Sequence, residues 1–385
     1  MKGYRKIRIK KQKYALKKRG MKIQKDKLFI ILVVIVSLIT IINIIYNYSR
    51  NNSPNVVENK NKQSEIYSKI RPELSLSNNE STKLEDNNNN NSTLNNESVV
   101  KPNNFEYFCC FCVMGKMENR YTRELISYYL SLGVDKFVIA DNNLPNTEKF
   151  TDVVQDYILN GTVDYIDIIG QFYEYAEYYE IMYQKYKNKC EWVTFFDFDE
   201  YLALYSEEGK KIALKEFLSN KKFDKCEAIE FNWLLYGDND LVYYDNRTSI
   251  ERFTKPDYEN RYNGYVKSMI RGGLKKTAFF PTQSIHKPDR NIITCSPDGE
   301  IPIKFSLDGL NPPNFKYGYL MHFNTRTAEE YVGKIKRGYA GNKYEPINER
   351  VNLFFTHNKF TKEKLEVFEK LLNHTFSRYH DRNDN

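Results

Sequence analysis

Four short apolar segments recur between Phe105 and Phe196, and they constrain the fold more than any other feature of the sequence. Each has the length and the apolar content of a strand that is buried on both faces. The predicted strands are 105–114, 136–140, 163–167 and 192–196. The segments between them predict helices over 121–133, about 147–160 and about 171–188. Strands that alternate with helices form a parallel sheet with helices on both faces, so we expect an α/β domain.

Polar residues stand where three of these strands end. They occupy Gly115–Asn119, Asp141–Asn143 and Asp197–Glu200. In parallel α/β sheets, ligands bind beyond the carboxyl ends of the strands. The three segments are therefore the candidate parts of a ligand site.

A long apolar segment, Leu28–Tyr46, contains no charged residue. At about 1.5 Å per residue, a helix of this length reaches roughly the thickness of the hydrocarbon core of a bilayer. A cleaved signal peptide is the alternative, but its apolar region is usually about 7 to 15 residues long and ends at a small-residue cleavage site. The residues Asn47–Arg50 do not supply such a site. We therefore expect one uncleaved transmembrane helix over 28–46.

The N-terminal tail, residues 1–27, contains thirteen Lys or Arg residues and one acid, Asp26. Basic residues stay on the cytosolic side of a membrane span, so we expect a type II orientation with most of the chain across the membrane. A nucleic-acid-binding arm is the alternative. Membrane topology and anionic lipid headgroups already explain a basic run beside a membrane span, so no nucleic-acid partner is predicted.

The next segment, residues 47–103, is rich in Asn, Ser, Glu and Lys and contains few large apolar side chains, which predicts a disordered stem. The remainder is predicted to form one large α/β domain over 104–345 and a C-terminal helical tail over 346–385. Glycosylation sequons begin at Asn79, Asn90, Asn91 and Asn96 in the stem and at Asn160, Asn246 and Asn373 beyond it. Such triplets are common by chance in an Asn-rich chain.

The six cysteines lack the paired spacing of a zinc site, so no zinc is predicted. Cys109, Cys110 and Cys112 fall within the first predicted strand, where core packing is the expected role. A disulfide between Cys190 and Cys226 is the pairing considered for an oxidising compartment.

The segment FFDFDEYL, residues 195–202, places three acids directly after the last of these four strands. If the chain stays extended, Asp197 and Asp199 point to one side and Glu200 to the other. Two carboxylates could then hold one Mg²⁺ or Mn²⁺ together with a diphosphate, and the ion would neutralise a departing nucleoside diphosphate. Acids at strand ends are often only solvated or capping. The α/β pattern before the pair and the Glu-Tyr-Leu after it favour the metal.

Eight segments in a fixed order carry a resemblance to a known family. They are KMENRY (116–121), LGVD (132–135), DNN (141–143), WVTFFDFDEY (192–201), NWLLYG (232–237), RFTK (252–255), VKSMIR (266–271) and HFNTRTAEEYVGKIKRG (322–338). With these motifs, residues 105 to about 345 resemble the family 2-like and family 92 glycosyltransferases, which share a GT-A fold. The chain departs from the family pattern at Leu125, Tyr129 and Phe323, which bears on the preference for donor or acceptor.

The resemblance implies a set of site residues. Lys116, Glu118, Asp141, Asn142 and Asp197 would line the nucleotide-sugar pocket, and Asp197, Asp199 and His322 would hold the metal. A satisfied buried histidine is the alternative for His322. Lys334, Lys336 and Arg337 follow on a predicted helix and face either a diphosphate or solvent. His286 lies where the family often has a histidine near the donor site.

The resemblance also implies an inverting transfer, in which a carboxylate takes the proton of the acceptor hydroxyl. Asp238 and Asp240 are the candidate bases, with ordinary loop acids as the alternative. Trp233 and Tyr236 are candidates for a platform that binds the acceptor and are equally credible as core residues.

These observations predict a metal-dependent, inverting glycosyltransferase with Mn²⁺ or Mg²⁺ as cofactor. It would move a hexose, with galactose as one candidate, from a nucleotide sugar, a UDP-sugar first, to a glycan or glycoconjugate. In a eukaryotic cell the type II anchor would place the domain in the Golgi lumen. One alternative is a membrane-tethered, non-catalytic carbohydrate-binding protein, which loss of either aspartate would have favoured. The other is a metal-dependent nucleotide-processing enzyme, which would need further acids grouped with the aspartate pair.

Overall fold

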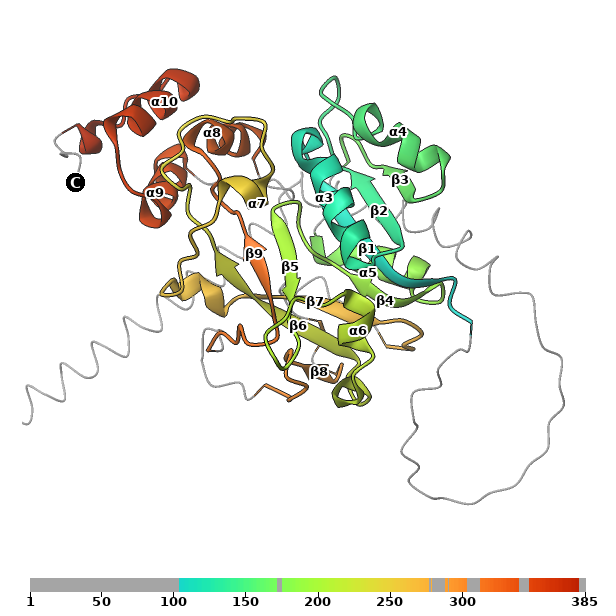
Figure 1. Cartoon of the computed structure of the whole chain (residues 1–385). Coiled ribbons are helices and arrows are strands. Elements are labelled where there is room, and N and C mark those ends of the chain that lie inside the picture. Colours follow the sequence, from blue (N-terminus) through green and yellow to red (C-terminus); the bar gives the residue numbers. More distant parts are fainter. Residues whose placement is uncertain are drawn as a thin grey trace, which may run out of the picture. The chain divides into compact units, whose positions relative to one another are not determined.

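A computed structural model describes residues 104–171, 175–276, 278, 288–289, 291–302, 312–338 and 346–380 (Figure 1). The predicted basic tail, membrane segment and stem lie outside these residues, as does His286. In the part of the chain that the structure describes, no helix is both long enough and apolar enough to cross a bilayer. The anchor over 28–46 therefore stays a prediction.

Four parallel strands form one half of the sheet, as the sequence predicts. They are β1 (Tyr107–Gly115), β2 (Lys136–Asp141), β3 (Val163–Asp167) and β4 (Cys190–Thr194). β1 lies between β2 and β4, and β3 pairs with the far side of β2. The register places Gly115 opposite Asp141 and Asp141 opposite Asp167, so the ends of three strands meet at one edge of the sheet.

Three helices connect these strands: α3 (Asn119–Leu132), α4 (Thr151–Leu159) and α5 (Tyr175–Tyr186). Alternate residues of β1 enter two different cores. Phe111 packs in the core that contains Leu125 of α3, and Cys110 packs in the core that contains Tyr183 of α5. α3 ends at Gly133, whose φ of 105° is left-handed, as the sequence predicts for a helix that stops at glycine. Helices thus cover both faces of the parallel half.

The second half of the sheet is mixed and was not predicted from the sequence. Its strands are β5 (Glu200–Leu204), β6 (Ala228–Leu235), β7 (Val266–Arg271), β8 (Thr294–Cys295) and β9 (Gly318–His322). Across the described residues the order is β3-β2-β1-β4-β7-β6-β9-β5, with β8 beside β6. β7 is antiparallel to β4 and β6, whereas β9 is parallel to β6 and antiparallel to β5. The β5–β9 register places Glu200 opposite His322.

The remaining elements are short helices and a C-terminal group. The short ones are α6 (Leu214–Leu218), η1 (Lys221–Phe223), α7 (Ser249–Arg252), η2 (Arg261–Gly264) and η4 (Ser377–Tyr379). The C-terminal group is α8 (Ala328–Arg337), α9 (Ile347–His357) and α10 (Lys362–Leu372), which lie together in Figure 1. Tyr331 of α8, Phe354 of α9 and Phe368 of α10 share one core. The predicted tail is therefore helical and packs on α8.

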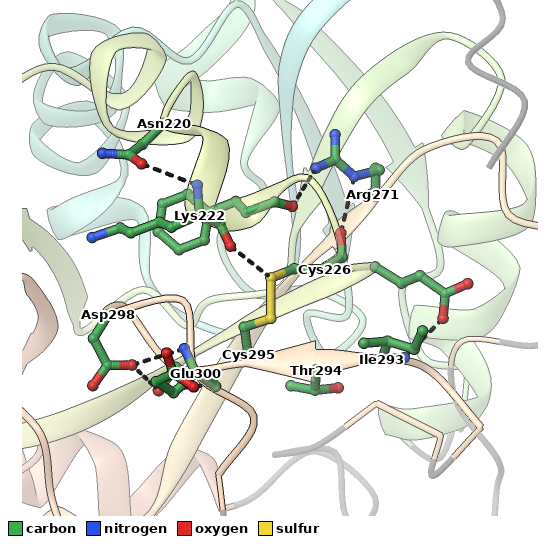
Figure 2. The surroundings of a disulfide bond; sticks show 12 residues. Asn220, Lys222, Cys226, Arg271, Ile293, Thr294, Cys295, Asp298 and Glu300 are labelled. Atoms are coloured by element: carbon green, nitrogen blue, oxygen red, sulfur yellow. Dashed lines mark hydrogen bonds between the residues drawn. A yellow bond between two sulfur atoms is a disulfide. The ribbon is translucent and has the colours of Figure 1, made fainter. Parts of the chain in front are cut away.

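Two disulfides correct the pairing that the sequence suggested. Cys110 bonds Cys190 across β1 and β4, and Cys226, just before β6, bonds Cys295 at the end of β8 (Figure 2). The proposed Cys190–Cys226 bond is wrong, because each of these residues has another partner. Cys109 and Cys112 are free thiols that pack in the core, as expected, whereas Cys110 does not stay free.

Candidate active site

The two aspartates lie on a tight turn between β4 and β5. The Glu200 N–H donates to the Asp197 carbonyl at 3.1 Å, and the Asp197 N–H donates to the Glu200 carboxylate at 2.8 Å. The chain is therefore not extended here, and the Glu200 side chain turns back toward Asp197. Phe198, between the aspartates, stacks on Phe150 with ring centroids 5.1 Å apart. This packing fixes the middle of the turn in the core.

Asp199 is nearly buried and faces a lysine and a histidine. The Lys334 ammonium lies 2.6 Å from one carboxylate oxygen, and His322 Nε2 lies 3.6 Å from the other. Burial opposes ionisation, but Lys334 and His322 outweigh it and hold the pKa of Asp199 well below its usual value. Burial lowers the pKa of His322 despite Asp199. The structure thus brings Asp199 and His322 together, as the resemblance implies.

Asp197 is about one third exposed and faces a different lysine. Its carboxylate lies 2.8 Å from the fully buried Lys267 ammonium and accepts a hydrogen bond from the Tyr179 hydroxyl at 3.2 Å. Burial alone lowers the pKa of Lys267, but Asp197 and Glu200 outweigh it and raise that pKa. Burial raises the pKa of Glu200 well above its usual value. A buried lysine therefore lies among the acids of the turn.

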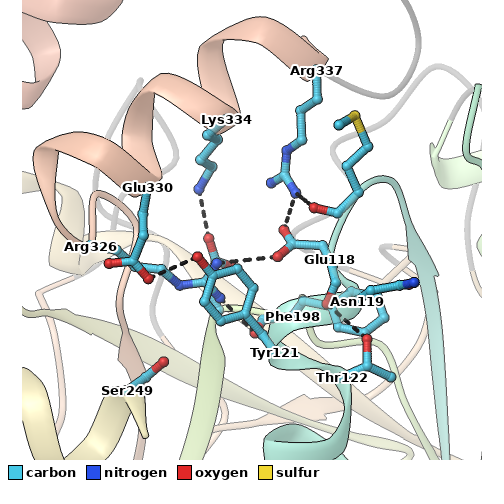
Figure 3. A network of polar contacts seen from close by, with 12 residues as sticks. Glu118, Asn119, Tyr121, Thr122, Phe198, Ser249, Arg326, Glu330, Lys334 and Arg337 are labelled. Carbon is cyan, nitrogen blue, oxygen red and sulfur yellow. Dashed lines mark hydrogen bonds and ion pairs between the residues drawn. The ribbon is translucent and has the colours of Figure 1, made fainter. Parts of the chain in front are cut away.

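A second group of charges joins the turn to α3 and α8 (Figure 3). Glu118 accepts from Arg326 at 3.2 Å and forms an ion pair with Arg337. Arg326 also donates to the Phe198 carbonyl at 3.1 Å, and its guanidinium lies 3.3 Å from the centroid of the Tyr121 ring. Glu118 was predicted to line the nucleotide-sugar pocket, and in the structure two arginines neutralise it.

A second buried ion pair, between Arg252 and Glu330, lies next to Tyr121, the ring that Arg326 contacts. The Tyr121 hydroxyl donates to Glu330 at 2.8 Å, and Arg252 contacts both carboxylate oxygens of Glu330 at 2.6 and 2.9 Å. Arg326 has a left-handed backbone with a φ of 52°, which is strained for an arginine. The surrounding charges keep it in this conformation beside the turn.

Asp141, another residue predicted to line the pocket, is completely buried, and its carboxylate accepts hydrogen bonds from the loop after β2. It accepts from the Asn143 and Phe150 N–H groups and from the Tyr165 hydroxyl, each at 3.0 Å. Asn142 donates to the Gln171 carbonyl at 2.9 Å. These contacts shape the loop after β2.

Lys116 lies half-exposed at the end of β1. Its carbonyl accepts from Arg337 at 2.8 Å, which ties the end of α8 to the end of this strand. Burial lowers the pKa of the Lys116 ammonium. Among the predicted pocket residues it therefore keeps a partly solvent-accessible charge beside the edge of the sheet.

The two candidate bases differ in their surroundings. Asp238 is buried and lies 2.6 Å from the buried Lys364 ammonium of α10, and burial raises its pKa. Asp240 is exposed and lies 3.4 Å from the exposed Lys255. The contacts of Asp238 favour a structural role, whereas Asp240 is accessible to solvent.

The candidates for an acceptor platform also differ. Trp233 is partly exposed, and its ring centroid lies 4.3 Å from that of His322. Tyr236 packs edge-on against Phe323 at 5.3 Å. Trp233 therefore lies beside the candidate site, where a side chain that binds the acceptor would have to lie.

A cavity of about 310 Å³ lies between the start of α3 and one face of α8. Its lining includes five cationic side chains, Arg120, Arg326, Lys334, Lys336 and Arg337. The lining acids Glu148, Glu329 and Glu330 each accept a hydrogen bond from another residue. A Cβ atom added at Gly333 would meet nothing within 4 Å, so this glycine leaves space on α8. Lys334 lines the cavity and contacts Asp199, which connects the cavity to the acidic turn.

Lys267 and Arg326 are site residues that sequence reasoning missed. Both stand in the quoted motifs, but a lone Lys or Arg in a sequence is usually read as a surface residue. Lys267 lies in VKSMIR, which also contains Ser268 and Arg271, so the segment gave no signal of a buried cation.

The fold and the site define a mixed α/β protein with a cation-lined cavity beside an acidic turn at the edge of its sheet. The chain belongs to glycosyltransferase family 92, whose family model matches residues 105–366. The predicted family is therefore confirmed, and the match extends into α10.

The individual proteins that match this chain share little sequence identity with it. Over 155 residues the chain is 28% identical to a glycosyltransferase family 92 protein of Arabidopsis thaliana. The matched region covers 38% of this chain and 26% of the relative. The chain thus spans about a quarter of that relative's length. Among solved structures it is similar to S. aureus TarS 1–349, with 12% identity, a TM-score of 0.29 and coverage of 69% and 71% of the two chains.

The same S. aureus protein in complex with UDP-GlcNAc gives 12% identity, a TM-score of 0.33 and coverage of 69% and 72%. These structural similarities are too distant to assign a residue or a ligand in this chain.

Proposed function

We propose that this protein transfers a hexose, with galactose as one candidate, from a nucleotide sugar to a glycan or glycoconjugate. Family membership supports glycosyl transfer, and a UDP-sugar is the first candidate donor. The observation that carries the proposal is the position of Lys334. It lines the cation-rich cavity and contacts Asp199, so an anionic diphosphate in the cavity would lie beside the acidic turn. We also propose that the domain has a GT-A fold, as the resemblance implies.

A Mn²⁺ or Mg²⁺ ion is part of this proposal, with Asp197, Asp199 and His322 as its ligands. Carboxylate oxygens and an imidazole nitrogen are suitable donors. The His322 Nδ1 atom is buried and has no hydrogen-bond partner among the described residues, and its Nε2 atom faces Asp199. A cation between Asp199 and His322 Nε2 would have to displace the Lys334 ammonium from Asp199, and Asp197 would have to turn from Lys267 to join it.

The described residues contain no ready-made group of three or more His, Cys, Asp or Glu side chains that could hold a metal. When bound, the ion would neutralise the leaving diphosphate. Lys334, Lys336 and Arg337 would hold the phosphate groups in the cavity, and Arg326 would keep the turn in position through the Phe198 carbonyl. These side chains would orient the donor and bind its charge.

An inverting transfer also needs a base for the acceptor hydroxyl. Asp240 is the stronger of the two candidates because it is exposed, whereas Asp238 is held by Lys364. We therefore propose that Asp240 takes the proton of the acceptor hydroxyl.

The cellular placement is proposed as well. The uncleaved helix over 28–46 would anchor a type II membrane protein, and the two disulfides support an oxidising compartment for the catalytic part. In a eukaryotic cell this compartment would be the Golgi lumen.

Turnover of nucleotide sugars tests the function. The purified full chain would be assayed against a panel of UDP- and GDP-sugars with Mn²⁺, with Mg²⁺ or with a chelator. We expect one nucleoside diphosphate to be released in a metal-dependent reaction, and Asp199→Asn to reduce the release by at least 100-fold, because a lost charge at a catalytic centre removes several kcal/mol. Glu216→Gln, an exposed change on α6, is the matched control. Full activity of Asp199→Asn, or full activity in chelator, would exclude the metal site.

A further inference from the structure

Each aspartate of the acidic turn already has its own lysine as a counter-charge. The Lys267 ammonium lies 2.8 Å from the Asp197 carboxylate, and the Lys334 ammonium lies 2.6 Å from the Asp199 carboxylate. A further cation at either aspartate would therefore meet a lysine that is in place before it. The surroundings of the two lysines differ, and they determine which lysine can be displaced.

Lys267 is fixed beside Asp197. Its side chain lies on β7 and is completely buried, and Asp197 is its only hydrogen-bond acceptor among the residues that the structure describes. If Lys267 left this carboxylate, it would be a buried cation without a hydrogen-bond acceptor, which is strongly unfavourable. Lys267 is therefore a permanent part of the turn.

Lys334 is held differently. Its ammonium also contacts the carbonyl oxygen and the side-chain oxygen of Asn324, each at 2.9 Å, and its side chain is 18% exposed. Lys334 and Asn324 both line the cation-lined cavity. The Lys334 ammonium therefore has other oxygen acceptors and an open space beside it.

The backbone that carries Lys334 is fixed, but its side chain can turn. Tyr331 and Val332 of α8 are buried in the core that α8 shares with α9 and α10. The adjacent Gly333 is exposed and leaves space on the helix. A lysine has a long, flexible stem and a compact ammonium, so it can change direction while α8 stays in place. Figure 3 shows the Lys334 side chain extending from α8 toward the polar network.

Movement of Lys334 has an electrostatic cost at both ends. The Asp199 side chain is 8% exposed, so loss of Lys334 would leave a nearly buried carboxylate without its closest counter-charge. The cavity that would receive the ammonium already contains Arg326, Lys336 and Arg337. A divalent cation at Asp199 removes the first cost, and a diphosphate in the cavity removes the second. Each ligand would therefore make binding of the other more favourable.

We propose that Lys334 is an exchangeable counter-ion, which occupies the cation position on Asp199 in the unliganded protein and moves to the diphosphate when a divalent cation binds there. Lys267 takes no part in the exchange. The acidic turn thus stays neutralised when both ligands are absent, and the two ligands bind cooperatively. This inference rests on the proposed function and adds how binding at its site is controlled.

Chemical labelling of lysines tests the exchange in the wild type. The full chain in detergent would be treated briefly with an amine-acetylating reagent, alone, with Mn²⁺, or with Mn²⁺ and UDP, and mass spectrometry would locate the labels. We expect Mn²⁺ to make Lys334 react about 5-fold faster, because it raises the fraction of molecules in which this ammonium is released, and UDP to reverse the effect. Lys336, exposed on the same helix, should react alike with and without Mn²⁺, whereas the buried Lys267 should stay unlabelled.

Variants measure the competition between Lys334 and the ion. Electron paramagnetic resonance would report free Mn²⁺ in the absence of nucleotide. Lys334→Met removes the competing ammonium and should bind Mn²⁺ about 10-fold more tightly than the wild type, a change within the usual range for coupled sites. Lys336→Met is the matched control on the same helix and cavity, and it should change the Kd for Mn²⁺ by less than about 3-fold because this lysine is exposed. Asp199→Asn should remove the binding.

The outcomes separate this inference from the proposed function. If Mn²⁺ binds the wild type but leaves the labelling of Lys334 unchanged, or binds a folded Lys334→Met no more tightly, the exchange is wrong and the metal site stands. If Lys334 exchanges as expected but no nucleotide sugar in the panel is consumed, the proposed transfer is wrong and the exchange stands. If Mn²⁺ binds neither protein, the metal site and the exchange are both wrong. The labelling result decides if Lys334→Met does not fold.

Discussion

Gly115, the last residue of β1, shows how closely one residue controls the acidic turn. A Cβ atom at this position would lie 2.4 Å from the Phe198 ring and 2.5 Å from the Phe150 ring. Neither ring can move freely, because the two stack on each other in the core. Phe198 lies between Asp197 and Asp199, so any side chain at Gly115 would displace both aspartates.

We therefore predict that Gly115→Ala lowers stability by about 1 to 3 kcal/mol through overpacking and reduces sugar transfer by more than the loss of folded protein explains. Thermal unfolding and turnover measured on the same preparation test this. Gly333→Ala is the control for stability, since it adds a Cβ atom in open space within α8 and should raise stability by about 0.5 to 1 kcal/mol. An active and fully stable Gly115→Ala would show that the turn tolerates the shift.

At the residue scale the sequence predicted some charged residues of the site and missed others. The resemblance related Asp199 to His322, and the structure places them 3.6 Å apart. Lys267 and Arg326 were not predicted because their burial depends on partners from other strands and loops. Asp141 was predicted to line the nucleotide-sugar pocket, and its carboxylate oxygens accept hydrogen bonds from its own loop, contacts that no residue pattern reveals.

Among the elements, α8 has the central role because it carries Lys334 and Arg337 to the site while its other face packs on α9 and α10. One buried ion pair fixes α10 to the loop after β6. Lys364 is fully buried and lies 2.6 Å from Asp238, and the neighbouring Asn358 accepts from the Asp238 N–H at 2.7 Å. The C-terminal helices are therefore anchored to the sheet by polar contacts as well as by their core.

Breaking this ion pair from one side should be costly. We predict that Lys364→Met destabilises the protein by about 3 to 5 kcal/mol, because it leaves the Asp238 carboxylate buried without its counter-charge. The double variant Asp238→Asn with Lys364→Met should recover part of this loss. Chemical denaturation of both variants measures the coupling, with Lys362→Met, an exposed lysine on the same helix, as the control. Equal losses in the single and double variants would contradict a buried ion pair.

Some strands were easier to predict from the sequence than others. The four parallel strands were predictable because strands buried on both faces read as continuous apolar runs. β7 contains Lys267, Ser268 and Arg271, so its sequence does not resemble a buried strand, and the Lys267 and Arg271 side chains find their partners only in the folded protein. The order of β5 and β9 depends on contacts between residues far apart in the chain.

At the scale of the whole molecule, two disulfides connect segments that are distant in sequence. They join residues 80 and 69 positions apart. Arg271 adds a hydrogen bond to the Cys226 carbonyl at 3.0 Å (Figure 2). Loops of this length lose much conformational freedom in the unfolded chain when they are closed. Spacing alone could not reveal the pairing, since six cysteines allow many connectivities.

We predict that replacing Cys226 and Cys295 by alanine lowers the free energy of unfolding by about 4 kcal/mol, the value expected for closing a loop of this size. Reductant should lower the Tm of the wild type. It should leave the Tm unchanged in a variant in which alanine replaces all four bonded cysteines. Calorimetry with and without reductant makes the comparison. A wild-type Tm that does not respond to reductant would indicate that the bonds are absent or inaccessible.

The strand order has a consequence for how the protein is made. β5 follows the acidic turn directly, yet its only partner in the described sheet is β9, which is synthesised much later. Lys334 and the helices that support it emerge later still. A growing chain on the ribosome therefore carries β5, directly after Asp197 and Asp199, without its partner strand until β9 has been made. The acidic turn would reach its final surroundings only after α8 has been made, and a chaperone that shields β5 during that interval would improve the yield of folded protein.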